Sequence, residues 1–207
     1  MLSRVADAIY WMNRYIERAE NYARFLDVNF NLSLELKKTE EQWMPLVITT
    51  GDVADFKERF EKSDKSSIIY FMGLDPLNTN SIYNSISKAR ENARSVRPEL
   101  TIEVWEQINS LYYDVKRGLD ERVWENKDPR FFFQSIKKSI QLLYGILDST
   151  ISRSDAWHFG KIGQLLERAD KTSRVIDVKY HILLPSLGAV GTSIDLIQWS
   201  ALLKSVS

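Results

Sequence analysis

The chain has 207 residues, 44% of them hydrophobic, which is enough for one domain with a sizeable core or for two small domains. Its 28 basic and 28 acidic residues balance, so the net charge gives no overall electrostatic footprint for nucleic acid or for an anionic membrane. The sequence contains no cysteine, which excludes disulfides, thiolate metal ligands and a cysteine nucleophile, and which is compatible with a reducing cytoplasm.

The first predicted element is a long helix that begins near Ser3 and continues to about Lys38. Charge appears from Arg4 onward, which is unlike a signal peptide, and no apolar run reaches the roughly 18 residues of a membrane span. We therefore expect a cytoplasmic protein with no membrane partner. At 100° per residue, one broad arc of this helix is apolar, and the opposite side mixes charged with aromatic residues. This pattern predicts a helix inside a bundle, with two buried or half-buried faces.

Further helices follow with short connections, in keeping with only 8 glycines and 5 prolines. The segment 67–74 has strand propensity, but no partner strands are evident, so we predict a helix there. Asp128 and Pro129 predict the N-cap and first position of a later helix. The other predicted helices are a short one capped by Thr39 and Gln42, and helices over 52–61, 81–97, 101–123, 128–152, 154–184 and 192–207. We expect a single all-α domain over residues 1–207, folded as a bundle of about seven helices.

A charged pattern in the first helix recurs 150 residues later. Ungapped comparison of residues 14–30 with residues 164–180 gives 6 identities in 17 positions. The identical pairs are Glu17/Glu167, Arg18/Arg168, Ala19/Ala169, Arg24/Arg174, Asp27/Asp177 and Val28/Val178. The repeat predicts that these two helices are central and adjacent in the bundle, with Glu17 and Glu167 facing a common interface.

The repeated charges define a candidate functional cluster with two open interpretations. The glutamates could act as bases or ligand anchors, and the arginines could bind carboxylate or phosphate through bidentate contacts. Reciprocal Glu–Arg pairs between helices could equally fix their register with no ligand. Each motif glutamate also lies nearly in line with the arginine seven positions later. The candidate residues are Arg14, Glu17, Arg18, Asn21, Arg24, Arg90, Glu91, Asn92, Arg94, Glu167, Arg168, Asp170 and Arg174.

The sequence motifs do not indicate a metal site or a nucleotide-binding site. Both motif helices carry acidic residues three apart, as in ferritin-type sites, but that class needs Glu-x-x-His, and neither histidine follows a glutamate at that spacing. The chain also contains no phosphate-binding glycine loop, no HExxH and no Gly-x-Ser-x-Gly. We therefore expect no metal and no cofactor.

The sequence resembles the bacterial alpha-E domain family, a helical domain with a Glu-Arg motif. The resemblance covers the chain end to end, in residues 4–21, 89–97, 152–157, 166–172 and 199–203. Family members are encoded beside, or fused to, circularly permuted ATP-grasp proteins and transglutaminase-like proteins. The resemblance therefore implies a role in peptide ligation or modification, as a helper or a second enzyme. Family members also usually continue further, so we expect this chain to be truncated at its C-terminus, where the last helix has no terminator.

Two functions follow from this resemblance as hypotheses. The preferred one is an accessory partner of an ATP-grasp-type ligase or a transglutaminase-like protein, not catalytic on its own. The alternative is an enzyme acting on a peptide-like substrate through the Glu-Arg seam, by which we mean Glu17, Arg18, Glu167 and Arg168. If the seam is a buried structural network, removing either arginine should cost about 3–5 kcal/mol of stability. The apolar residues on both sides of each motif favour this costly outcome.

Overall fold

The computed structural model describes residues 1–36, 43–125, 128–178 and 190–206, which form helices and turns with no β-strand among them. The α-helices of this part are α1 (Ser3–Leu36), α2 (Met44–Thr50), α3 (Val53–Arg59), α4 (Lys65–Ile69), α5 (Ile82–Ser95), α6 (Ile102–Asp120), α7 (Arg130–Thr150), α8 (Asp155–Val178) and α9 (Ser193–Val206). The predicted all-α class is confirmed, with nine α-helices in the described residues instead of about seven.

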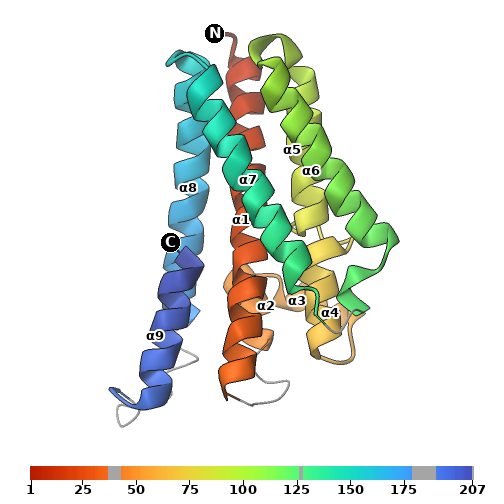
Figure 1. The fold of residues 1–207 in the computed structure, drawn as a ribbon, viewed down its shortest axis with the longest axis vertical. Helices are drawn as coiled ribbons and strands as arrows, with labels where there is room; N and C mark the ends of the chain where they lie inside the picture. The colour runs from red at the N-terminus through yellow and green to blue at the C-terminus, as the bar shows by residue number, and fades with distance from the viewer. Residues whose placement is uncertain (37–42, 126–127, 179–189, 207) are drawn as a thin grey trace.

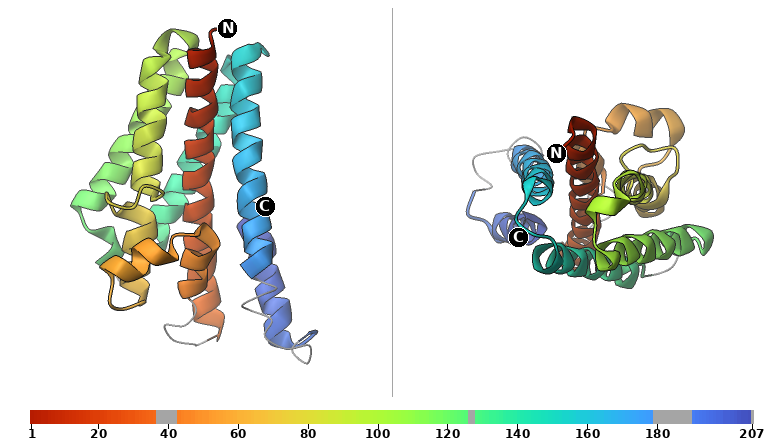
Figure 2. Two further views of the ribbon diagram at one scale, coloured as in Figure 1. Left: turned by 180° about the vertical axis from the view of Figure 1, so that it is seen from behind. Right: turned by 90° about the horizontal axis from the view of Figure 1, so that it is seen from above.

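Helix α1 runs along the centre of the bundle, and the other long helices surround it (Figure 1). From behind, α1 lies between α5 and α8, and from above α8 lies at the edge of the bundle (Figure 2). Helix α8 runs parallel to α1: the N-terminal ammonium of Met1 lies 3.4 Å from Asp155 Oδ2 at the start of α8, and further along both helices Arg18 Nε lies 2.7 Å from Glu167 Oε1. Helices α1 and α8 are therefore adjacent and point the same way. This is the arrangement in which equivalent residues of the two motifs lie at the same level.

The core forms where the apolar stripe of each helix faces α1. Met12, Ile16 and Leu26 of α1 are fully buried, as are Ile86 of α5 and Ile140 of α7. Burying each such side chain contributes roughly 1.5–3 kcal/mol. The side of α1 that carries the charges is buried too, so the prediction of a second covered face is confirmed.

Several predicted elements are confirmed at their ends. The segment 67–74 is helical, as α4 followed by the π-helical turn η2 (Tyr70–Leu74). Ser81 and Thr101 are N-caps, and their hydroxyls accept hydrogen bonds from the Asn84 and Val104 amides at 3.2 and 3.4 Å.

Other boundaries shift by a few residues. Helix α7 begins at Arg130, one residue later than predicted, because Pro129 is its N-cap while Asp128 Oδ1 accepts the Arg130 N–H at 3.1 Å. Helix α6 ends at Asp120, and a separate 3-10 turn, η4, covers Val123–Glu125. The predicted capping box at Thr39 and the predicted ends of the helices near 38 and 184 lie outside the described residues.

Candidate functional site

The two Glu-Arg motifs bind each other across the α1–α8 interface. Glu17 accepts two hydrogen bonds from Arg168, with Nε–Oε1 at 2.7 Å and Nη2–Oε2 at 3.0 Å. Glu167 accepts two from Arg18, with Nε–Oε1 at 2.7 Å and Nη2–Oε2 at 3.1 Å. Because the helices are parallel and the motifs are in register, each glutamate binds the arginine of the other helix. The predicted adjacency of Glu17 and Glu167 is confirmed.

The two halves of the seam differ in their additional partners. Glu17 also accepts a hydrogen bond from the Tyr144 hydroxyl of α7 at 2.7 Å and one from Asn21 Nδ2 at 3.3 Å. Glu167 instead accepts one from Arg14 Nε at 2.8 Å and lies 3.7 Å from Lys171 Nζ. Among the described residues, the Glu17 carboxylate therefore contacts one cation, whereas the Glu167 carboxylate contacts three.

The seam continues into the turn before α5. Arg18 Nη1 donates to Asn80 Oδ1 at 2.9 Å, and Asn80 Nδ2 donates to Asp52 Oδ1 at 2.9 Å. Asp52 directly precedes α3. One chain of hydrogen bonds thus joins α8, α1, the turn before α5 and the connection between α2 and α3.

Two glycines of α8 let the motif helices approach each other. A Cβ on Gly163 would lie 2.3 Å from the Tyr10 carbonyl oxygen of α1, and a Cβ on Gly160 would lie 2.8 Å from Asn13 Nδ2. Only a residue without a side chain fits so close to the α1 backbone. This close contact lies about one turn above the seam, and it positions the α8 motif against the α1 motif.

Burial and charge shift the acid–base properties of the seam. Burial, the largest influence on Glu167, would raise its pKa, but hydrogen bonding and charge from Arg18, with Lys171 and Arg14, outweigh it and lower the pKa. The hydrogen bond to Glu17 raises the pKa of Arg168. Burial and the charge of Glu17 raise the pKa of Tyr144 well above its ordinary value, so Tyr144 remains a hydrogen-bond donor.

Glu20 lies one turn from Glu17, and its pKa is shifted in the direction opposite to that of Glu167. Its Oε1 accepts from Arg24 Nη2 at 2.5 Å, but its buried Oε2 has no hydrogen-bond partner in the part of the chain that the structure describes. Burial raises the pKa of this carboxyl, against the lowering influence of Arg24. The neighbourhood of the seam therefore contains one stabilised carboxylate, Glu167, and one destabilised carboxylate, Glu20.

We expect Glu167 to titrate below the ordinary glutamate pKa of 4.5 and Glu20 above it, as followed by NMR of the side-chain carboxyl carbons. Since the folded-state pKa of Glu167 is lowered, its stabilising contribution is complete above the unfolded-state pKa and is lost as pH falls through the folded-state pKa. The contribution of Glu20 to stability has the opposite sign. Because its folded-state pKa is raised, the protein becomes more stable as pH falls from above that pKa towards the unfolded-state value of 4.5. A Glu20 midpoint at or below that of a free glutamate would contradict this assignment.

The other candidates divide between the two motif helices and α5. Arg24 pairs with Glu20 on α1, and Arg174 pairs with Asp170 on α8 at 3.0 Å, the equivalent i,i+4 pair of the repeat. Although Glu17 and Arg24 lie in line on α1, the ion pair of Arg24 is with Glu20 and that of Glu17 is with Arg168.

The four candidates of α5 lie outside this network. Arg90 donates to Asn109 Oδ1 at 2.6 Å, and its guanidinium lies 4.7 Å from the centre of the Tyr112 ring. Glu91 and Arg94 form an exposed pair at 2.8 Å, and Asn92 lies beside them on the same helix. Arg90 therefore packs α5 against α6, away from the seam.

Four residues of the network were missed in the sequence: Tyr144, Asn80, Asp52 and Lys171. The first three belong to a helix and two connecting segments that share no pattern with the motifs, so their spacing does not identify them. Lys171 stands at the position equivalent to Asn21 in the repeat, and that equivalence could have identified it.

We searched the described residues for metal-binding groups and for membrane-spanning helices. No group of three His, Asp or Glu side chains within them is placed to hold a metal ion. None of the described helices combines the length and apolar character needed to cross a membrane.

Fold and site define a helical bundle in which two parallel helices are held together by reciprocal Glu–Arg pairs. A family described as a predicted alpha-helical domain with a conserved ER motif matches residues 1–207. The chain belongs to this family, Alpha-E. Comparison with curated proteins and with solved structures gave no match.

Proposed function

We propose that this domain is a non-catalytic interaction partner of an ATP-grasp-type ligase or a transglutaminase-like protein in peptide ligation or modification. The supporting observation is the state of the two motif glutamates. Both side chains have no exposed surface, and their oxygens accept hydrogen bonds from arginine. A general base must reach the proton that it removes, directly or through one water. Glu17 and Glu167 are instead placed as structural anions, which favours the accessory role over catalysis at the seam.

A surface suited to a protein partner lies on the outer side of α8. Exposed positions there alternate in steps of three and four residues, the spacing of a coiled-coil seam. These positions are Phe159, Ile162, Leu166, Ala169, Ser173 and Ile176, which we call the α8 stripe. Ile162 and Leu166 are 54% and 50% exposed, and α8 lies at the edge of the bundle (Figure 2). This spacing fits the apolar face of one helix, so we propose that the ligase contributes an amphipathic helix to the contact.

Substitution of Leu166 by glutamate tests the proposal. The charge would be buried against the partner helix and would weaken the contact. A loss of about 1.4 kcal/mol of binding free energy lowers the affinity tenfold. We therefore expect at least a tenfold loss of co-purification when the domain is co-expressed with the ATP-grasp-type ligase. Because Leu166 is exposed, the melting temperature of the isolated domain should change little.

Leu142→Glu is the matched control, because Leu142 is a 56% exposed leucine on α7. It should leave co-purification unchanged. Equal retention of the ligase by the Leu166→Glu variant would contradict the proposed contact, and a wild-type dimer dissociated by Leu166→Glu would assign the stripe to self-association. Turnover by the isolated domain with ATP, peptides and amines, lost in Glu17→Gln, would overturn the accessory role itself.

A further inference from the structure

Side chains of α1 and α5 form a cationic face, and these two helices lie side by side in the view from behind (Figure 2). Its residues Arg14, Tyr15 and Arg18 of α1 are half-buried, as is Lys88 of α5. The Tyr15 ring lies close to two cations: its centre is 5.6 Å from the guanidinium carbon of Arg18 and 5.4 Å from Lys88 Nζ. Arg18 and Lys88 therefore approach the same aromatic ring from two different helices.

The charges of this face do not balance. Arg14 and Arg18 both bind the single carboxylate of Glu167. Lys88 Nζ donates to the carbonyl oxygen of Thr79 at 3.0 Å, and no carboxylate of the described residues lies within ion-pair distance of it. Three cations thus face one carboxylate, which leaves two positive charges in excess.

The neighbouring acids do not remove this excess. Lys171 is a further cation beside Glu167, and it shares the carboxylate of Asp170, at 3.1 Å, with Arg174, so this acid has no negative charge to spare. Asp52 reaches Arg18 only through the Asn80 side chain. Burial lowers the pKa of Lys88, and the positive charge of Arg18 lowers it further, so this ammonium is held where its charge is disfavoured. Unfavourable charge arrangements of this kind are typical of binding sites.

We propose that Arg18 and Lys88, together with Arg14, bind the phosphate group of a phosphate-bearing ligand. A phosphate monoester carries a charge of about −1.5 to −2 at neutral pH, which matches the excess of two, whereas a single carboxylate would neutralise half of it. Its three oxygens also match the donors that remain. Arg18 uses three of its five N–H groups in the contacts to Glu167 and Asn80, and Lys88 uses one of three.

The seam has a second role in this arrangement. Glu167 holds Arg18 by two hydrogen bonds and Asn80 holds it by a third, so the guanidinium is fixed before any ligand arrives. A fixed cation loses little side-chain entropy on binding. The site is independent of the α8 stripe, because Lys88 and Tyr15 lie on α5 and α1.

Calorimetric titration at constant ionic strength tests the site with three probes: inorganic phosphate, adenosine monophosphate and phosphoserine. We expect saturable binding of inorganic phosphate with a Kd of about 1 mM or tighter. Lys88→Gln should weaken binding at least about tenfold, because a charge-assisted contact is lost. Lys88→Arg retains the charge and should retain most of the affinity.

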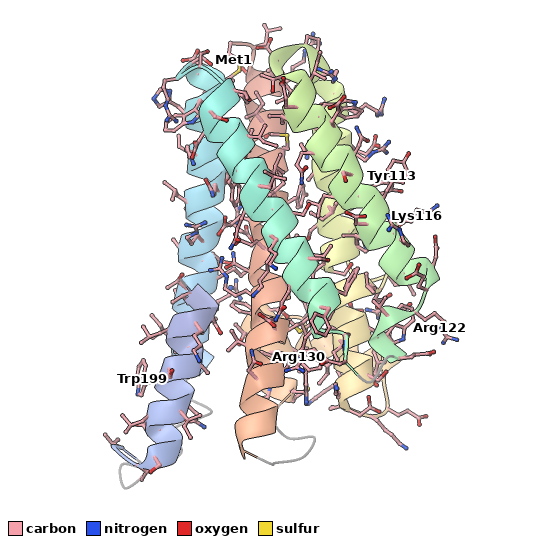
Figure 3. All side chains as sticks on the ribbon, viewed as in Figure 1. Met1, Tyr113, Lys116, Arg122, Arg130 and Trp199 are labelled. Atoms are coloured by element: carbon pink, nitrogen blue, oxygen red, sulfur yellow. The ribbon has the colours of Figure 1, made fainter. Side chains whose placement is uncertain are left out.

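Lys116→Gln supplies the matched control, since it removes the same charge from an exposed lysine on the outer side of α6 (Figure 3). It should leave binding unchanged. Tighter binding of adenosine monophosphate than of phosphate would identify a nucleotide ligand, tighter binding of phosphoserine would identify a phosphorylated side chain, and equal affinities would identify the phosphate group alone. The proposal is overturned if none of the three probes saturates, if Lys88→Gln binds like wild type, or if Lys116→Gln weakens binding equally.

Discussion

Replacing Arg168 by alanine is expected to lower the free energy of unfolding by about 3–5 kcal/mol, the cost of leaving a buried carboxylate without its cation. Among the described residues Arg168 is the one cation bound to Glu17, whose side chain has no exposed surface, while the Arg168 side chain itself is 39% exposed. After the substitution only the Tyr144 hydroxyl and the Asn21 amide remain to stabilise the Glu17 charge. For a chain of this length the melting temperature should fall by at least about 6 °C.

Arg18→Ala should cost less, although the sequence predicts a high cost for both arginines. Glu167 keeps the hydrogen bond from Arg14 and the charge of Lys171 when Arg18 is removed. We expect a loss of about 1.5–3 kcal/mol, the range for hydrogen bonds to charged groups. Thermal melts of the two variants measured side by side show which substitution lowers stability more. A larger loss of stability for Arg18→Ala than for Arg168→Ala would contradict the asymmetry of the seam.

A double variant separates the cost of an orphaned charge from the value of the pair. Glu17→Met combined with Arg168→Met removes both charges and keeps comparable volume. We expect it to recover most of the stability lost in Arg168→Ala, because replacing a whole buried ion pair by apolar residues is often neutral. If melting temperatures of Arg168→Ala and Arg18→Ala both stay within a degree or two of wild type, the seam is not a buried structural network.

The same glycine-to-alanine change is expected to have opposite effects at Gly163 and Gly145. A Cβ at Gly163 would lie 2.3 Å from the Tyr10 carbonyl oxygen, and this backbone atom cannot move unless α1 and α8 separate. Overpacking of this kind costs about 1–3 kcal/mol or more. It would also displace the seam, so the hydrogen bonds of Glu17 and Glu167 would weaken together.

Gly145 is the matched control within a helix of the same bundle. A Cβ there would meet no atom of the other described segments within 4 Å. Alanine should therefore stabilise α7 by about 0.5–1 kcal/mol through its higher helix propensity. Denaturant unfolding of the two variants measures both changes, and stabilisation by Gly163→Ala would show that α1 and α8 are not in close contact at this point.

The seam also accounts for the presence of the same motif on two helices. A parallel pair related by the repeat brings Glu17 opposite Arg168 and Glu167 opposite Arg18, so each motif supplies the partner that the other needs. A slip of one helix by a turn would separate the buried Glu17 carboxylate from Arg168. Because orphaned buried charges are costly, the seam selects one register of α8 on α1.

The sequence by itself determined the all-α class, most helix boundaries and the pairing of the two motif helices. Helix formation and capping depend on contacts within four residues, such as the Ser81 hydroxyl with the Asn84 amide, and these are visible in local patterns. The repeat adds one long-range relation, because equivalent motifs at equal depth in a bundle are expected to meet.

Only the tertiary structure decided which side chains complete the site. Tyr144, Asn80 and Lys88 reach the motifs from other elements, and Arg90 turns towards α6 in spite of its motif-like surroundings. These outcomes depend on the rotation of each helix about its own axis and on how closely Gly163 allows α8 to approach α1. Rotation and approach are set by the packing of the whole core, a sum of many weak contacts between residues far apart in the chain, which no local pattern records.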